Sequence, residues 1–189
     1  MKEQFINICK EKIKREGIDE FLSWLVTTDF FTAPASTRFH GNFDGGLLQH
    51  SLNVYEQMIK ILPTTPFKDK FTEETIAIVC LMHDICKVNF YAKGFRNVKD
   101  QDTGKWFQKE VYEVNEKVPL GHGEKSCIIL QQFMRLNIEE LLAIRWHMGG
   151  FDTATKGGDF GMSGAQDYTP LVTLLQVADM LATLQEEKR

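Results

Sequence analysis

The sequence lacks any long apolar segment. A helix that spans a membrane needs about 18 or more consecutive apolar residues, whereas the longest apolar run covers only residues 76–82. The stretch from Met1 to Lys14 mixes charged with apolar side chains and therefore lacks the apolar centre of a secretion signal. We expect neither a membrane-spanning nor a secreted protein.

Cysteine is scarce, and the CxxC spacing typical of metal-binding and redox pairs is absent. The four cysteines are Cys9, Cys80, Cys86 and Cys127. Three of them lie in apolar segments that are predicted to be helical, where a free thiol packs as a small hydrophobic group. This usage indicates a reduced protein, and we expect it in the cytoplasm.

An excess of positive charge is also missing. Lysine and arginine number 22 against 26 aspartates and glutamates, which gives a net charge of −4. Proteins that coat duplex DNA through bulk electrostatics need the opposite balance, so the charge argues against that class. A local basic pocket for one phosphate group is compatible with it.

The residues that are present suit one globular domain. The 189 residues are 43% hydrophobic and 25% charged, which is ordinary for a globular chain that is long enough to bury a core. We expect a single domain over residues 1–189, with N-terminal helices within residues 1–30.

Apolar residues at helical spacing predict a mostly α-helical fold. Leu48, Leu52 and Tyr55, for example, share one face of a helix predicted over residues 47–62. Capping residues predict further helix starts at Thr72, Asn137 and Thr169.

Two segments break the helical pattern. Residues 88–118 include an alternating stretch and the turn-forming residues 100–104, which predicts a β-hairpin inserted over about residues 92–118. Residues 148–168 are rich in glycine and are predicted to form a loop. The expected fold class is therefore all-α, a helical bundle with a small β-hairpin insertion.

Candidate metal ligands are spread along the chain. The five histidines are His40, His50, His83, His122 and His147, and the candidate carboxylates are Asp84 and Asp179. Imidazole and carboxylate groups hold divalent metals such as Zn, Fe, Mn or Co. A lone helical histidine is more often a packed or surface residue, and a salt bridge or an exposed position explains many helical aspartates. The ordered set is much more specific than any of its members.

Five short segments carry a resemblance to a known family. They are GGLLQHSL at 45–52, HDICK at 83–87, LGHGE at 120–124, WH at 146–147 and AD at 178–179. In this order they resemble the HD-domain metal-dependent phosphohydrolases. The first segment is particularly similar to small HD hydrolases and to the HD part of a bacterial 3′-to-5′ exoribonuclease. The resemblance covers a core of about residues 38–182 and implies an HD-domain helical bundle.

The resemblance also implies a metal site. One divalent ion would be held by His50, His83, Asp84 and Asp179. His122 and His147 match the extra histidines of members with two metals, in which Asp84 would bridge the ions. With one metal, these two histidines would instead contact the substrate phosphate or stabilise the leaving group. Fe, Mn, Zn, Co, Ni and Mg are all candidate ions, because such ligands accept several metals.

Asp84 and Lys87 are the candidate catalytic residues. Lys87 matches the lysine in the HDxxK form of the family motif. Its three-residue spacing from Asp84 puts both on one side of the helix if the helix continues. The lysine would stabilise charge on a phosphate oxygen, and the alternative is an ordinary surface lysine. Metal-activated water would attack, so no covalent intermediate is needed.

Candidate substrate contacts lie in three places. Arg38 and His40 precede the first ligand in a loop, where similar family members carry a basic residue or a histidine. Trp146 precedes His147. The hairpin carries basic and aromatic residues that would bind phosphate and stack a base, namely Lys93, Arg96, Asn97, Trp106 and Tyr112. The alternatives are ordinary loop polarity and a solvated hairpin with one packed face.

The expected function is hydrolysis of a phosphate ester in a nucleotide or a short nucleic acid. The expected partner is a phosphorylated small molecule such as a nucleotide, or else a single-stranded nucleic acid. No interaction with a membrane is expected. Two alternatives stay open, a 3′-to-5′ exonuclease and a nucleotide-sensing HD protein without turnover. The oligomeric state does not follow from the sequence, and a fold by itself does not fix the substrate.

Overall fold

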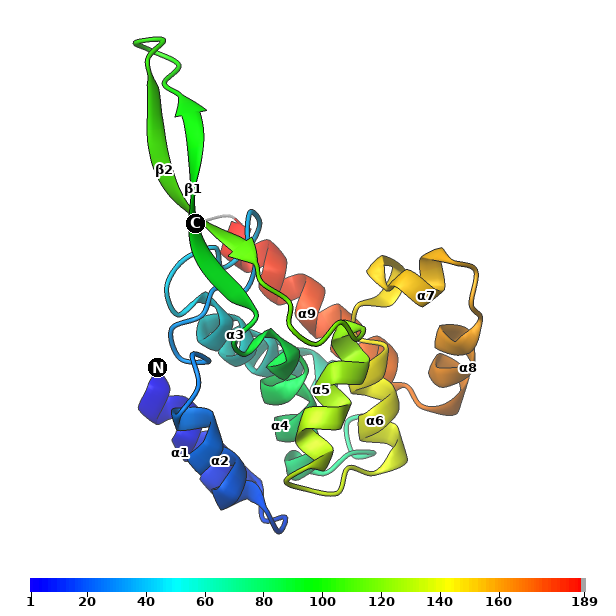
Figure 1. Cartoon of the computed structure of the whole chain (residues 1–189). Helices are drawn as coiled ribbons and strands as arrows, with labels where there is room; N and C mark the ends of the chain where they lie inside the picture. The colour runs from blue at the N-terminus through cyan, green and yellow to red at the C-terminus, as the bar shows by residue number, and fades with distance from the viewer. Residues whose placement is uncertain (188–189) are drawn as a thin grey trace.

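Helices dominate the structure, a computed structural model that describes residues 1–187 (Figure 1). The helices are α1 (Lys2–Lys12), α2 (Ile18–Val26), α3 (Gly46–Ile61), α4 (Glu73–Met82), α5 (His122–Gln131), α6 (Ile138–Arg145), α7 (Thr153–Lys156), α8 (Gly161–Tyr168) and α9 (Leu171–Glu187). The 3-10 turns are η1 (Leu62–Thr64), η2 (Ile85–Lys87) and η3 (Gly149–Phe151), and the strands are β1 (Tyr91–Lys99) and β2 (Trp106–Val114). The predicted helical bundle with one small hairpin is confirmed.

α4 lies at the centre of the bundle. Every residue from Thr75 to Met82 is buried, as expected for a helix that is apolar on nearly all sides. α3 packs against both α4 and α9, α1 packs against α4, and α5 packs against α6. His83 and Asp84, which follow α4 directly, are therefore enclosed by the bundle.

Capping contacts explain where α4 and α6 begin. The Thr72 side chain accepts a hydrogen bond from the Thr75 amide at 3.1 Å. Asn137 and Glu140 exchange the two hydrogen bonds of a capping box, each 2.9 Å long. The buried Glu140 carboxylate also lies 2.6 Å from an Arg15 guanidinium nitrogen, which ties α6 to the segment between α1 and α2. Both predicted helix starts are confirmed.

The hairpin extends away from the helical bundle (Figure 1). β1 and β2 pair in antiparallel fashion, with Lys99 opposite Trp106 at the outer end. The Asp100 carboxylate closes the turn, because it accepts a hydrogen bond from the Thr103 amide at 2.7 Å. Only the inner end of the hairpin lies near the helices.

The prediction of a loop over residues 148–168 is wrong, because this segment contains η3, α7 and α8. Asp152 caps α7 by accepting a hydrogen bond from the Ala154 amide at 2.9 Å. Ala165 of α8 packs with Trp146 in a small second core. These contacts outweigh the low helix propensity of a glycine-rich sequence.

The longest described helix is α9, with 17 residues. None of the helices in the described part of the chain has both the length and the apolar character needed to cross a membrane.

Candidate metal centre

Three histidines and two aspartates from distant parts of the chain converge inside the bundle. His50 lies in α3, His83 and Asp84 follow α4, His147 follows α6, and Asp179 lies in α9. The first four are at most 3% exposed. All five were predicted as metal ligands from the sequence, and the structure brings them together.

The Asp84 carboxylate lies between the three imidazole rings. Its Oδ2 atom is 3.5 Å from His83 Nε2 and 3.9 Å from His50 Nε2, and its Oδ1 atom is 3.4 Å from His147 Nε2. Asp179 Oδ1 lies 3.1 Å from His50 Nε2. All three histidines thus turn the same ring atom toward carboxylate oxygens, and this donor set suits a borderline divalent cation.

Backbone contacts fix the tautomers of His83 and His147. Their Nδ1 atoms lie 2.9 Å from the Cys80 carbonyl oxygen and 2.7 Å from the Ile144 carbonyl oxygen. A carbonyl oxygen only accepts, so Nδ1 carries the hydrogen and Nε2 carries a lone pair in the neutral ring. Both Nε2 atoms are buried and have no hydrogen-bond partner among the described residues. Such an arrangement is costly unless an ion is bound, so these residues fit a divalent metal.

Lys87 lies against the same carboxylate, with Nζ 2.7 Å from Asp84 Oδ2 and only 10% of its side chain exposed. The contact forms although α4 ends before it and η2 follows. Burial raises the pKa of Asp84, but Lys87 and His83 outweigh this effect and hold that pKa well below its ordinary value. Burial lowers the pKa of Lys87, but Asp84 raises it overall. Lys87 is therefore a buried, charged residue and not a surface lysine.

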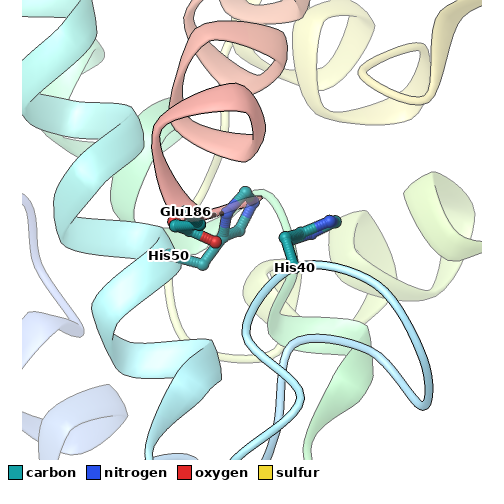
Figure 2. Close-up of side chains that lie close together, drawn as sticks. All are labelled: His40, His50 and Glu186. Atoms are coloured by element: carbon teal, nitrogen blue, oxygen red, sulfur yellow. Dashed lines mark hydrogen bonds and ion pairs between the residues drawn. The ribbon is translucent and has the colours of Figure 1, made fainter. Parts of the chain in front are cut away.

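Sequence reasoning missed Glu186, which contacts the Nδ1 atom of His50, on the side of the ring away from Asp84 and Asp179. Glu186 Oε1 lies 3.2 Å from His50 Nδ1 and accepts a hydrogen bond from Asn53 Nδ2 at 2.8 Å. Figure 2 shows Glu186 at the end of α9 against His50 of α3. Glu186 follows Asp179 by seven residues, which puts both on one face of α9. That periodicity was the signal that could have identified it.

We call the converging residues His50, His83, Asp84, His147 and Asp179 the cluster. His122 lies at its edge, at the first position of α5. Its Nδ1 atom is 3.3 Å from Cys86 Sγ. A ring nitrogen of His122, Cys86 Sγ and a carboxylate oxygen of Asp84 all lie within 4.8 Å of one another. Cys86 was not predicted as a site residue. His122, Cys86 and Asp84 are therefore a second group of potential ligands, which shares Asp84 with the group of His83, Asp84 and His147.

Of the two candidate loop contacts, only His40 lies against the cluster. Its ring centre is 4.8 Å from that of His50 (Figure 2). Burial, together with the nearby His50, lowers the pKa of His40 to about 4, so the ring is neutral near neutral pH. Arg38 is exposed in the same loop.

The predicted hairpin contacts do not converge on the cluster. Lys93 Nζ lies 3.0 Å from Glu110 Oε1 and 3.7 Å from Asp44 Oδ1, and the Tyr112 hydroxyl donates to Asp44. The remaining three, Arg96, Asn97 and Trp106, lie on the outer part of the hairpin.

Trp146 does not reach the cluster either, although it is adjacent to His147. It is buried in the second core, and the Arg145 guanidinium lies 3.9 Å from the centre of its ring. The expected substrate contact at this position therefore has a simpler explanation in packing.

Comparison with known proteins agrees with this geometry. The family model for the HD domain matches residues 47–184, which is more than half of the chain. No curated protein and no solved structure gives a significant match. The matched region contains all six predicted ligands, from His50 to Asp179. The chain therefore belongs to the HD-domain superfamily of metal-dependent phosphohydrolases.

Proposed function

We propose that the protein hydrolyses a phosphate ester of a nucleotide or a short nucleic acid with water activated by one or two divalent cations. The observation that carries this proposal is the pair of buried Nε2 atoms of His83 and His147. They face the Asp84 carboxylate and have no hydrogen-bond partner among the described residues. Membership in the HD family supports hydrolysis, and the donor set supports a cation.

The proposed ligands of one cation are His50, His83, Asp84 and Asp179. A second cation would use Asp84 as a bridge, with His122 and His147. When bound, such cations lower the pKa of a water molecule and neutralise phosphoryl oxygens.

The chain's own residues would bind and orient the ester. The Lys87 ammonium, which Asp84 holds in place, would donate a hydrogen bond to a phosphoryl oxygen and stabilise the charge that develops there. Arg38 and His40 would contact the substrate from the loop before α3. In the net reaction, a water oxygen bonds to phosphorus, the bond from phosphorus to the alcohol oxygen breaks, and the alcohol leaves with a proton.

A second candidate function is exonuclease activity on single-stranded nucleic acid. The hairpin favours it, because Trp106 and Phe95 are each 69% exposed and lie with Lys99 on one face of the sheet. Aromatic rings combined with basic side chains form binding platforms for single strands. The acidic net charge of the whole chain weighs against an unaided processive nuclease.

The decisive experiment combines elemental analysis with a substrate comparison. Protein purified without chelator should contain divalent metal and should release phosphate from a mononucleotide. Asp84→Asn should lose both the metal and the activity, whereas Asp69→Asn, at an exposed position, should keep both. A protein that binds none of the candidate ions would overturn the proposal, and a metal-loaded protein that is inert toward all phosphoesters would favour nucleotide sensing.

A shortened hairpin separates the two catalytic hypotheses. Gly94 and Val111 are opposite each other in the sheet, so a two-residue Asn-Gly turn can join them directly. Loss of cleavage of an end-labelled oligonucleotide, with mononucleotide hydrolysis unchanged, would indicate the exonuclease function.

A further inference from the structure

A groove with a volume of about 430 Å³ opens beside His122. Three chain segments line it: Phe90 before β1, residues 116–122 between β2 and α5, and residues 148–153 after His147. The volume lies within the range of small-molecule sites in proteins. Of its lining residues, His122 is a proposed metal ligand, and none belongs to β1 or β2.

The groove adjoins the candidate metal centre at His122. His122 forms part of its wall, and a ring nitrogen of the same residue lies within 4.8 Å of an Asp84 carboxylate oxygen. Met148, which also lines the groove, directly follows the buried His147. A phosphoryl group at the metal centre would therefore leave the rest of an ester next to the groove.

The lining of the groove is apolar and aromatic. It includes Phe90, Leu120, Met148 and Phe151. The Phe90 ring packs 5.6 Å from the His122 ring, centre to centre, whereas Phe151 is 73% exposed and Leu120 is 44% exposed. Apolar side chains that remain exposed around a concave surface are typical of a ligand site.

Basic side chains pair with the two carboxylates that line the groove. Glu116 Oε1 lies 2.8 Å from Lys125 Nζ, and Asp152 Oδ2 lies 2.8 Å from an Arg145 guanidinium nitrogen.

Two further charged residues lie at the groove. A second Arg145 nitrogen is 2.7 Å from Glu124 Oε1, and Lys156 Nζ lies 5.5 Å from the centre of the Phe151 ring. These three carboxylates and three basic side chains compensate one another, so the groove offers little net attraction to a further phosphate or to a cation. Its chemistry favours an uncharged, planar ring.

We infer that this groove binds the nucleobase of the phosphate ester, with one face of the base against the exposed Phe151 ring. The inference rests on the proposed function for the position of the phosphate. It assigns the base to the groove and not to Trp106 or Tyr112, since Trp106 lies at the outer end of the hairpin and Tyr112 binds Asp44.

The test separates binding of the base from hydrolysis. Equilibrium dialysis would measure binding of each of the four common ribonucleosides, which carry no phosphate, to the wild type and to Phe151→Ala. We expect at least one nucleoside to bind the wild type, and Phe151→Ala to weaken that binding about 10-fold. Phe151→Trp should preserve it, and the control Phe160→Ala, at a residue 84% exposed outside the groove, should leave it unchanged.

Kinetics of the metal-loaded protein provide the second readout. For the matching nucleoside monophosphate, Phe151→Ala should raise KM about 10-fold with little change in kcat, whereas KM for glycerol 3-phosphate should not change. The inference is overturned if no nucleoside binds, or if Phe151→Ala leaves both nucleoside binding and KM unchanged. If nucleosides bind through Phe151 but no ester is hydrolysed, the inference stands and the proposed function fails.

Discussion

At the scale of single residues, the most consequential contact is the buried ion pair between Asp84 and Lys87. The Asp84 Oδ2 atom contacts the Lys87 ammonium and also faces His83 and His50, whereas Oδ1 faces His147. Asp84 can therefore hold a cation and position Lys87 at the same time. Mutation of Lys87 alone should then affect catalysis without affecting metal binding.

Lys87→Met should separate catalysis from metal binding. The variant keeps most of the side-chain volume but removes the ammonium that would stabilise phosphoryl charge, so we expect kcat to fall about 100-fold. Metal content, measured by elemental analysis, should stay at the wild-type value. Lys60→Met, at an exposed position, is the control, and an unchanged kcat in Lys87→Met would remove Lys87 from the catalytic residues.

Glu186→Gln should weaken metal binding without removing a ligand. The Glu186 carboxylate accepts the Nδ1 hydrogen of His50, which orients Nε2 toward Asp179 and makes the ring a better donor. We expect about a 10- to 100-fold loss of metal affinity in competition with a chelator. Glu56→Gln, on the exposed part of α3, should bind metal like the wild type. Equal affinities in the two variants would contradict the orienting role.

At the scale of elements, a partly buried ion pair ties α6 to the segment that follows it. Arg145 of α6 lies 2.8 Å from Asp152, which also caps α7. Burial raises the pKa of Asp152, but Arg145 outweighs it and holds the pKa below the ordinary value. A lowered pKa means that the carboxylate stabilises the fold above its unfolded pKa of about 4, and that this stability is lost as the pH falls through the folded pKa.

Asp152→Asn should therefore destabilise the fold in a pH-dependent way. The amide oxygen can still cap α7, but the charge opposite Arg145 is gone, so we expect a loss of about 1 kcal/mol at pH 7. In urea titrations, the difference from the wild type should shrink as the pH falls below about 4. Asp69→Asn, at an exposed position, should show no such trend. A difference that stays constant down to pH 2 would refute the role of the charge.

The elements also show which parts of the structure a sequence can predict. Thr72 and Asn137 marked their helices because caps are local signals, and the hairpin was predicted from alternation and a turn, which are local as well. α8 was missed because it depends on a distant partner, with Ala165 against Trp146, whereas α7 was missed although its Asp152 cap is a local signal. The convergence of His50, His83 and Asp179 was expected from the resemblance. The burial of Trp146 depends on contacts between distant segments, whereas Glu186 was missed although its spacing from Asp179 was a signal in the sequence.

At the scale of the whole molecule, a bound cation would connect α3, the end of α4 and α9. Such a ligand stabilises the folded state by mass action, by about 2.7 kcal/mol at 100 times its Kd. For a chain of this size, we expect Tm to rise by about 5–10 °C on metal addition. Differential scanning calorimetry with and without chelator measures this shift, and the Asp84→Asn variant should show none. An equal shift in that variant would place the cation elsewhere.

The position of α9 has a consequence for biosynthesis. Asp179 and Glu186 belong to the last helix of the described chain, so an emerging polypeptide that has exposed only its first 170 residues holds the histidines but not these two carboxylates. A complete set of ligands for the proposed cation would then form only after Asp179 has left the ribosome. A ribosome that stalls before that point would present an incomplete chelator, and co-translational metal uptake should appear as a late step.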